Sequence, residues 1–491
     1  MRPRRSRSTR DSSPVPAFRP AVAQWSRRSF AGAALLASVI VQAPDCRAQA
    51  PGWPGVPQGD PVFTATLGVA IGPPSAAQSG LRTLLDRGTP DAAAGLILAL
   101  RYNRRDARDI GAALARLTGA PAAETWDRWM LWQETHPSVR PHASYAALTE
   151  AVHSLIDPAF SRFLGPSRIG SAARTAIRIE EITWGGVQVD GIPALVDPAH
   201  VPAAEAGYLG ADEPVFGVAL NGEARAYPLR ILDWHEMAND VVGGVPVALA
   251  YCTLCGAGIL FEARAPGRDE RFVFGSSGLL YRSNKLMHDR ATDSLWNQFA
   301  GTPVVGPLVG SGIALKILPV VVTSWGAWRT RHPRTSVLSL RTGHDRDYEP
   351  GRSYGRYFAS PDLMFPAAVT DQRRPQKDIV FGIRAVGGAK AWPVEVLARR
   401  PVINDRVGAL DVVLLRDGTP RGLRAYERGG RQFKAADATG AALVDDAGTT
   451  WLVQEDALVG PDRQRLPRVA GHLAYWFAWA GYMGERAELA E

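Results

Sequence analysis

Cysteine is scarce in this chain: its 491 residues include three cysteines, two of them in the stretch YCTLCGAG at 251–258. After residue 50 no run approaches about 18 uninterrupted apolar residues, so we expect no transmembrane segment in that part of the chain. A phosphate-binding loop and a dinucleotide-binding glycine fingerprint are also missing, and we expect no nucleotide cofactor.

Positive charge is concentrated at the N-terminus. Residues 1–50 hold nine arginines and two aspartates, a net charge of +7, whereas the whole chain carries +8. The remainder is therefore close to neutral. A basic surface that would attract nucleic acid is not expected, so we predict no nucleic-acid partner.

The first 50 residues have the pattern of an export signal. The stretch SRRSF at 26–30 precedes the apolar run AGAALLASVIV, and Ala-Gln-Ala at 48–50 resembles a cleavage site. The paired arginines followed by phenylalanine indicate a twin-arginine signal peptide, with an ordinary signal peptide or a membrane anchor as the alternative. We therefore expect a periplasmic or secreted protein that is exported by the twin-arginine route.

Hydrophobic periodicity changes once along the rest of the chain. Between residues 62 and 180 apolar residues recur every three or four positions, as in DIGAALARLTG, which predicts helices. From residue 181 short β-prone runs alternate with turns such as Asn221-Gly222, a hairpin signal. We predict an α+β protein with these parts: signal peptide 1–50, linker 51–61, helical domain 62–180, first repeat 181–345, connecting loop 346–377 and second repeat 378–491.

The strand-rich part contains an internal repeat. VFGVALNGEARAYPLRIL begins at Val215 and VFGIRAVGGAKAWPVEVL begins at Val380, and at this offset 13 of 33 aligned residues are identical. We predict an internal duplication whose two copies share a fold and pack with pseudo-two-fold symmetry. Residues kept in both copies are expected to serve the fold, and in the first copy they are Gly217, Gly222, Pro228, Asn239, Asp240 and Gly243.

Residues that occur in one copy only are free to carry a function. The polar residues of the first copy face unrelated residues of the second in these pairs: His235 and Arg400, Glu236 and Pro401, Cys252 and Asp417, Cys255 and Pro420. We therefore expect the chemistry to belong to the first copy.

The cysteine pair is the main chemical signal. Export would remove Cys46, and a disulfide between Cys252 and Cys255 would close too small a loop to stabilise much structure. Two thiols on one tight turn, for which Gly256 is suited, supply half of a tetrahedral metal site. An open coordination position would suit a metalloenzyme or oxidoreductase. We predict a copper or zinc site formed by Cys252, Cys255 and His235, with His288 and Glu236 as further candidate ligands.

Two other functions fit the same residues. A metal-free thiol–disulfide redox protein would use Cys252 and Cys255, and Asp289 and Arg290 are further candidate catalytic residues. A non-catalytic binding or assembly module would leave the cysteines inert or in a structural disulfide, and its helical domain would bind a protein partner. In the first two functions the partner is a small molecule or a metal.

Several strings of the strand-rich part occur together and in order: DGIPAL (190–195), ARAYPLRILDWHEMAND (224–240), YCTLCGAG (251–258) and LMHDRATDSLWNQ (286–298). In these strings the chain resembles the bacterial family called domain of unknown function 3179. The likeness covers about residues 180–400 and leaves 51–180 outside. Where that family usually has a proline and an aromatic residue, this chain has Thr253 and His288. The resemblance implies a shared fold and no particular reaction.

Overall fold

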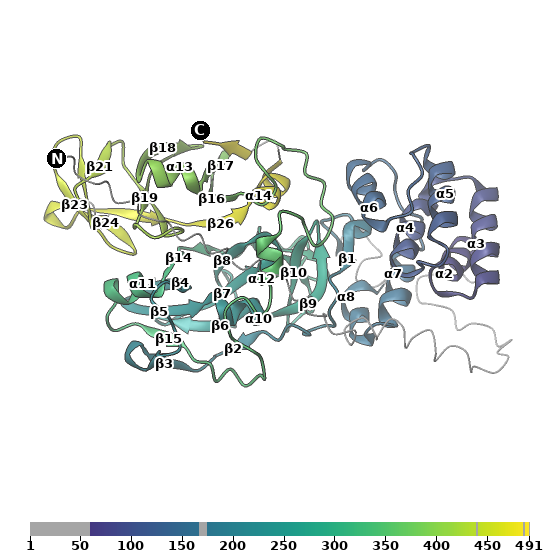
Figure 1. Cartoon of the computed structure of the whole chain (residues 1–491), viewed down its shortest axis with the longest axis horizontal. Coiled ribbons are helices and arrows are strands. Elements are labelled where there is room, and N and C mark those ends of the chain that lie inside the picture. The colour runs from purple at the N-terminus through teal and green to yellow at the C-terminus, as the bar shows by residue number, and fades with distance from the viewer. Residues whose placement is uncertain (1–58, 166–173, 438–439, 485–486, 491) are drawn as a thin grey trace, which may run out of the picture. The chain divides into compact units, whose positions relative to one another are not determined.

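The computed structural model describes residues 59–165, 174–437, 440–484 and 487–490. The predicted signal peptide and most of the predicted linker lie outside these residues. Helices come first along the chain and strands dominate after residue 181 (Figure 1), which confirms the predicted α+β class. Among the helices of the described ranges, none has the length and apolar character needed to cross a bilayer.

The helical part is built from short helices with well-defined ends. Asp60 caps the first of them by accepting hydrogen bonds from the backbone N–H groups of Val62 and Phe63, at 2.8 and 2.9 Å. Gly88 and Gly119 end α3 and α5 in the left-handed conformation, which costs glycine little. The α-helices are α2 (Pro61–Ile71), α3 (Pro74–Arg87), α4 (Ala93–Tyr102), α5 (Ala107–Thr118), α6 (Trp126–Thr135), α7 (Tyr145–Ser154) and α8 (Ser161–Leu164).

The first copy forms three five-stranded sheets, with the strand orders β1-β9-β10-β11-β12, β13-β8-β7-β6-β2 and β14-β4-β5-β15-β3. Asn221 and Gly222 join β4 to β5 with φ angles of 48° and 84°, so the predicted hairpin is confirmed. The elements are β1 (Ile182–Trp184), β2 (Leu195–Val196), β3 (His200–Pro202), β4 (Pro214–Leu220), β5 (Glu223–Pro228), α10 (Leu229–His235), β6 (Met237–Val242), β7 (Val245–Cys252), β8 (Ala257–Glu262), β9 (Phe274–Tyr281), β10 (Asn284–Asp289), β11 (Leu295–Asn297), β12 (Thr302–Val305), β13 (Ile317–Leu318), β14 (Val321–Ser324), α11 (Trp325–Arg331), β15 (Ser336–Leu338) and, after it, α12 (Gly355–Ala359).

The second copy forms a four-stranded sheet of order β26-β16-β17-β27 and an eight-stranded sheet of order β18-β19-β20-β25-β24-β23-β22-β21. Its elements are β16 (Ile379–Ala385), β17 (Gly388–Pro393), α13 (Val394–Arg399), β18 (Val402–Val407), β19 (Leu410–Arg416), β20 (Leu423–Glu427), β21 (Phe433–Ala435), β22 (Ala442–Asp445), β23 (Thr450–Val453), β24 (Ala457–Val459), β25 (Arg465–Val469), β26 (Gly471–Tyr475), α14 (Trp476–Met483) and β27 (Ala487–Leu489).

The two repeated segments have equivalent strand pairings. β4 pairs with β5 from Val215 opposite Pro228, and β16 pairs with β17 from Val380 opposite Pro393. Each hairpin is followed by a short helix and a second hairpin, β6–β7 or β18–β19. The paired residues differ by the same offset as the aligned sequences. The structure thus gives the segments equivalent elements, while their origin by duplication and a pseudo-two-fold packing stay predictions.

The Asn-Asp pair kept in both copies makes the same hydrogen bonds in each. Asn239 donates to the carbonyl of Phe274 at 2.9 Å and accepts from its N–H at 2.8 Å. Asn404 holds the backbone of Phe433 in the same way, with both bonds at 2.7 Å. Each asparagine side chain thus makes the two hydrogen bonds that a neighbouring strand would otherwise make with the phenylalanine backbone. Both asparagines therefore serve the fold.

The neighbouring aspartate of each pair holds an aromatic residue and a cation. Tyr227 donates to Asp240 at 2.7 Å, and the indole of Trp392 donates to Asp405 at 2.9 Å. The cations, at equivalent positions, are Arg225 at 2.7 Å from Asp240 and Lys390 at 2.8 Å from Asp405.

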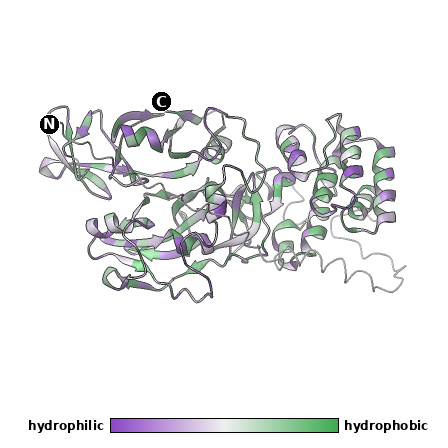
Figure 2. Ribbon diagram, viewed as in Figure 1, coloured by the Kyte–Doolittle hydropathy of each residue, from purple (hydrophilic) through white to green (hydrophobic). Residues whose placement is uncertain are grey.

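Hydrophobic residues occur on helices and strands alike (Figure 2), and they form shared cores rather than one core for each copy. One core contains Phe216 and Leu249 of the first copy together with Trp392 and Leu473 of the second. Burial of such side chains contributes on the order of 1.5–3 kcal/mol each. The two copies are therefore held together by apolar packing, and the cysteine turn lies within a continuous interior.

Candidate functional site

The two cysteines of the predicted site lie on the turn that joins β7 to β8. β7 ends at Cys252, a 3-10 turn covers Thr253–Cys255, and Gly256 follows with a φ of 59°. A Cβ at position 256 would come within 3.2 Å of the Tyr475 ring, so both backbone conformation and space favour glycine there. The turn connects two antiparallel strands and no α-helix begins at Cys252, unlike the cysteine pair of a thioredoxin-like protein.

Both thiols are reduced and buried, with exposed fractions of 1% for Cys252 and 0% for Cys255. Polar groups from β10 and from the end of β11 surround Cys255. The Nδ2 of Asn284 donates to the Cys255 sulfur at 3.1 Å and to Gln298 Oε1 at 2.9 Å. Gln298 in turn donates to two carbonyls of the β7–β8 hairpin, at 2.9 and 3.0 Å. The position of Cys255 is therefore fixed by a chain of hydrogen bonds.

A buried ion pair lies beside the same turn. The ammonium of Lys285, whose exposed fraction is 4%, lies 3.2 Å from Glu236 Oε2 and donates to the Glu236 carbonyl at 3.2 Å. Glu236 Oε1 accepts hydrogen bonds from Thr253 at 2.8 Å and from Tyr354 at 3.2 Å. A buried charge is stable only when it is paired and hydrogen-bonded, and both ions meet that condition.

These neighbours give the two thiols different acidities. Burial and the charge of Glu236 raise the pKa of the Cys252 thiol. The hydrogen bond from Cys255, with the backbone N–H and the charge of Lys285, outweighs both and leaves this pKa below its ordinary value. Burial and the Cys252 sulfur hold the pKa of the Cys255 thiol well above its ordinary value. The Cys252 thiol is therefore the more acidic of the two.

His235, the predicted third metal ligand, uses both ring nitrogens elsewhere. Nδ1 lies 2.8 Å from the carbonyl of Pro193, to which it must donate, and Nε2 accepts from the hydroxyl of Tyr348 at 2.6 Å. Burial lowers the pKa of His235 to about 4, so the ring is neutral. Within the described residues no group of three or more His, Cys, Asp and Glu side chains could hold a metal ion. The predicted set of Cys252, Cys255 and His235 is not brought together.

His288, a lower-ranked candidate ligand, belongs to a different cluster of side chains. Its Nε2 lies 3.4 Å from Asp190 Oδ1, and Arg290 binds both oxygens of Asp190 at 3.1 Å. Gly275 makes room for this cluster, because a Cβ there would lie 2.4 Å from Asp190 and 2.5 Å from His288. Arg290 thus pairs with an aspartate 100 residues away rather than with its neighbour Asp289.

Asp289 is a structural carboxylate. It accepts hydrogen bonds from the backbone and hydroxyl of Thr292, at 2.7 and 2.8 Å, and from the indole of Trp296 at 2.9 Å. In the described part of the chain these bonds occupy the turn after β10 and do not reach the cysteines. Asp289 and Arg290 therefore make their contacts where β10 ends. Glu236 is the one predicted accessory residue that borders the cysteine turn.

The structure adds residues that were not among the predicted site residues. Asn284 and Lys285 follow the turn after β9, and Tyr354 and Tyr357 come from the segment around α12. The Tyr357 hydroxyl donates to the carbonyl of Leu254, between the two cysteines, at 2.6 Å. In the sequence, the aromatic cluster RSYGRYF (352–358) could have indicated Tyr354 and Tyr357. The polar pair Asn284-Lys285, which lies within a strand, could have indicated the other two residues.

The fold and site define an α+β protein with a buried, reduced dithiol beside a lysine–glutamate pair. The family model described as "Protein of unknown function (DUF3179)" matches residues 189–486, which is more than half of the chain. The chain therefore belongs to this family, and the match extends through the second copy, beyond the predicted limit near residue 400. No curated protein and no solved structure matches the chain.

Proposed function

We propose that this protein is a thiol–disulfide oxidoreductase in which Cys252 is the nucleophile and Cys255 the resolving thiol. The observation that carries the proposal is the pairing of two reduced thiols on one turn, with Cys252 held next to the Lys285 charge and Cys255 held by Asn284. A thiolate is the reactive form of cysteine, and the residues around the pair favour the thiolate at Cys252 and not at Cys255.

The exchange would proceed in two displacements. The Cys252 thiolate attacks one sulfur of a substrate disulfide. A Cys252–substrate S–S bond forms, the substrate S–S bond breaks, and the other substrate sulfur leaves as a thiolate. Cys255 then attacks the Cys252 sulfur, forms the Cys252–Cys255 bond and passes its proton to the departing sulfur, which leaves as the second substrate thiol. The protein dithiol is oxidised by two electrons to a Cys252–Cys255 disulfide, and the substrate disulfide is reduced to two thiols.

The residues around the two cysteines would have different roles in the exchange. Lys285 stabilises the negative charge on Cys252, and Glu236 keeps the lysine in place through its carboxylate and its carbonyl. Asn284 orients the Cys255 sulfur toward the turn. Because both sulfurs are buried under Tyr354 and Tyr357, exchange requires the segment around α12 to move.

The test is a redox titration of the purified protein. After equilibration with mixtures of reduced and oxidised glutathione, trapping of free thiols by an alkylating reagent and mass spectrometry should show one reversible Cys252–Cys255 disulfide. In a Cys255→Ser variant the mixed disulfide should accumulate on Cys252, and a Cys252→Ser variant should form little of either. The proposal fails if the wild-type thiols stay reduced at every glutathione ratio.

Binding of copper or zinc by the same sulfurs is a second candidate, supported by their position on one tight turn. Because no third side-chain ligand from the described residues joins them, monovalent copper held by two soft thiolates suits the turn better than tetrahedral zinc. Elemental analysis of the native protein and of a Cys252→Ser/Cys255→Ser variant decides the matter. Stoichiometric metal that disappears in the variant supports the metal site, and metal-free native protein with a titratable disulfide supports the redox function.

Export through the twin-arginine route is proposed from the arginine pair near the N-terminus. Replacement of both arginines by lysine should retain the protein in the cytoplasm, which fractionation of the expressing cells can measure. An unchanged distribution between cytoplasm and periplasm would contradict the proposed route.

A further inference from the structure

A pocket of about 390 Å³ lies close to the cysteine turn. Its wall includes Lys377, whose Nζ lies 3.6 Å from the centre of the Tyr357 ring and 5.3 Å from that of Tyr475. These are the rings that reach the turn, Tyr357 through its bond to the Leu254 carbonyl and Tyr475 through its place beside Gly256. The pocket is thus connected to the cysteine turn through Lys377 and these two rings.

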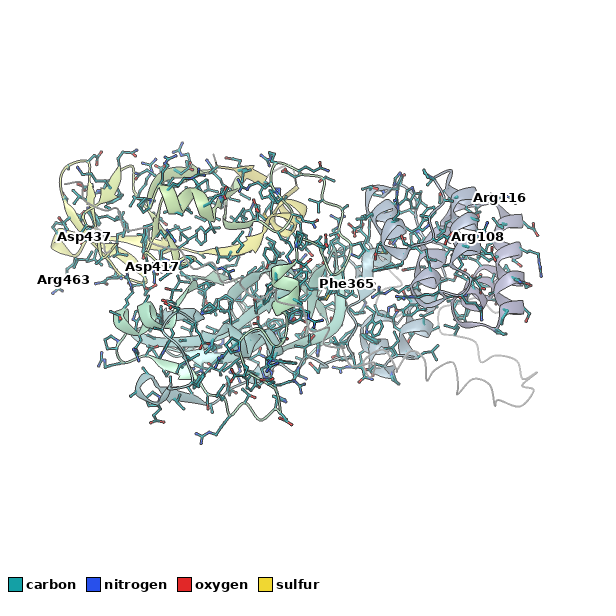
Figure 3. The ribbon with its side chains drawn as sticks, viewed as in Figure 1. Arg108, Arg116, Phe365, Asp417, Asp437 and Arg463 are labelled. Atoms are coloured by element: carbon teal, nitrogen blue, oxygen red, sulfur yellow. The ribbon has the colours of Figure 1, made fainter. Side chains whose placement is uncertain are left out.

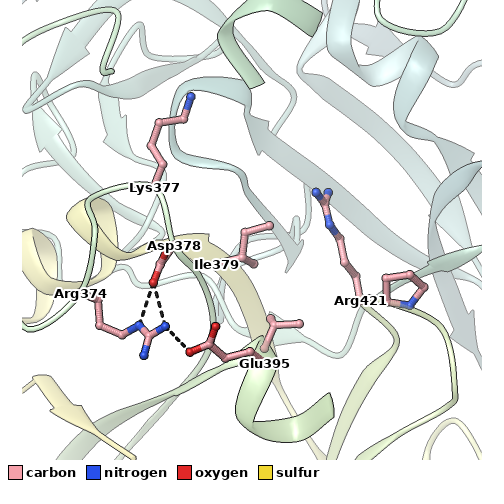
Figure 4. A pocket seen from close by; sticks show the side chains of 8 residues that line it. Arg374, Lys377, Asp378, Ile379, Glu395 and Arg421 are labelled. Carbon is pink, nitrogen blue, oxygen red and sulfur yellow. Dashed lines mark hydrogen bonds and ion pairs between the residues drawn. The ribbon is translucent and has the colours of Figure 1, made fainter. Parts of the chain in front are cut away.

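The charged residues of the pocket do not neutralise one another. Arg374 is bound by Asp378 at 2.8 Å and by Glu395 at 2.5 Å, and the dashed lines of Figure 4 mark these contacts. The ends of Lys377 and Arg421 point away from these two carboxylates (Figure 4). The pocket therefore holds three cations and two anions, and its two carboxylates are both used by Arg374.

Lys377 and Arg421 differ in what they bind. The ammonium of Lys377 donates to the carbonyl of Ser360 at 2.6 Å and to that of Tyr357, so it has no carboxylate partner. Arg421 is exposed, and within the described residues its guanidinium makes no hydrogen bond or ion pair. Asp233, a buried side chain on α10 that does not line the pocket, is within electrostatic reach of Arg421. Arg421 thus lines the pocket without a carboxylate bound to it.

We propose that this pocket binds the negatively charged end of a small disulfide, so that the dithiol prefers anionic disulfide substrates to cationic ones. The proposal rests on the proposed redox function and adds the charge class of its substrate. Arg421 would supply the attraction, since a cation without a counter-ion in a partly enclosed site raises the local concentration of anions. Lys377 would add to the positive potential from the opposite wall.

The experiment compares two disulfides of equal length and opposite charge, 3,3′-dithiodipropionate and cystamine. The reduced protein is mixed with each at low ionic strength, and the rate of Cys252–Cys255 disulfide formation is followed by quenching with N-ethylmaleimide. Each rate is normalised to the reaction of the same disulfide with 2-mercaptoethanol, a neutral thiol. We expect the normalised rate for the dianion to exceed that for the dication by about tenfold or more.

Variants separate the role of Arg421 from that of net charge. Arg421→Gln should reduce the ratio of the two rates several-fold, and Arg421→Lys should keep most of it. Arg82→Gln is the matched control: it removes one exposed arginine on α3, which does not line the pocket, and should leave the ratio unchanged. Added salt should lower the ratio of the wild-type protein.

The possible failures are distinguishable. If the wild-type protein reacts with both disulfides but Arg421→Gln leaves the rate ratio unchanged, the pocket inference is overturned and the redox function stands. If neither these disulfides nor oxidised glutathione forms the Cys252–Cys255 disulfide, the redox function fails and the inference fails with it. In the Cys252→Ser/Cys255→Ser variant, calorimetry should still detect binding of 3,3′-dithiodipropionate, and loss of this binding on adding Arg421→Gln would support the pocket independently.

Discussion

The two copies build different interiors on equivalent hairpins. In the first copy the turn after β7 carries Cys252 and Cys255. In the second copy the turn after β19 carries Asp417, labelled in Figure 3, which binds Arg424 at 2.6 Å. Arg424 has an exposed fraction of 1% and also binds Glu455 at 2.8 Å. The scaffold tolerates either a dithiol or a buried ion-pair network at this turn, so it does not depend on the cysteines.

The comparison separates charges that hold the fold from charges that act on a reactive group. Arg424 and the carboxylates around it satisfy one another. Burial alone would raise the pKa of Glu455, but Arg424, with His332 and Arg468, outweighs burial and holds this pKa well below the usual range. In the first copy, Lys285 and Glu236 form a similar pair but also act on Cys252. The buried charges thus stabilise the fold in the second copy, whereas in the first copy they also change the acidity of a thiol.

The largest predicted effect is the loss of the ion-pair network of the second copy. Arg424→Met leaves the buried Asp417 carboxylate without its cation and removes one partner of Glu455, which keeps Arg468. We expect the free energy of unfolding to fall by about 3–5 kcal/mol. Urea denaturation measures this change. As a control, Arg406→Met removes an exposed partner of Asp411 and should cost less than about 1 kcal/mol. Equal small losses for both variants would mean that the network does not hold the second copy together.

A second prediction concerns Asp233, whose position in the second copy is occupied by Ala398. Burial raises the pKa of Asp233 from its ordinary value of 3.8 to about 7. Below about pH 3 the carboxyl is largely protonated in both the folded and the unfolded chain, so it does not change the free energy of unfolding. As the pH rises toward 7 the unfolded chain ionises first, and stability falls by up to about 4 kcal/mol, a loss that is complete above pH 7.

Asp233→Asn should remove this pH dependence. Thermal unfolding should show the variant more stable than the wild type at about pH 8 and similar to it at about pH 3. A constant difference between the two proteins at both pH values would show that Asp233 is ionised in the folded state.

A third prediction tests the equivalence of the two copies directly. Asn239→Ala and Asn404→Ala each leave the N–H and C=O of one phenylalanine without a partner. We expect each to lower the free energy of unfolding by about 2–3 kcal/mol, with the larger loss for the more buried Asn239. A large loss for one variant and none for the other would show that Asn239 and Asn404 do not have equivalent structural roles.

The smallest predicted effect is confined to the reactive hairpin. Lys285→Met combined with Glu236→Gln removes the ion pair without leaving an unpaired buried charge. The Glu236 charge raises the pKa of the Cys252 thiol more than the Lys285 charge lowers it, so the loss of both charges should lower this pKa slightly. The pH dependence of iodoacetamide reaction measures this shift. Cys252→Ser should abolish the reaction at that site, and a raised pKa in the double variant would contradict the stronger influence of Glu236.

Local sequence signals predicted the parts of the fold that depend on neighbouring residues. Asn221-Gly222 predicted a hairpin because both residues accept positive φ, and Cys252 to Gly256 predicted a turn between strands. The periodicity of residues 62–180 predicted helices because apolar residues must share one face of a helix. The shared Asn-Asp pair was expected to serve the fold, and its hydrogen bonds in both copies agree with that role.

The accessory residues of the site could not be predicted in the same way. His235 is close to the cysteines in sequence, but its nitrogens bind Pro193 and Tyr348, which come from other segments. Arg290 was a candidate catalytic residue for the cysteine site, and it binds Asp190. A histidine or an arginine binds whichever partner long-range packing brings within reach, and spacing along the chain carries no information about that partner.

By itself, the sequence determined where the chain changes from helices to strands, the repeated hairpins, and the single turn with two thiols, because these depend on backbone conformation and on the period of apolar residues. Only the tertiary structure decided that Asn284 and Lys285 meet the cysteines, that Tyr354 and Tyr357 cover them, and that Arg421 faces a pocket nearby. The pairing of distant strands sets those positions. The acidity of a buried thiol depends on the charges that this pairing places around it.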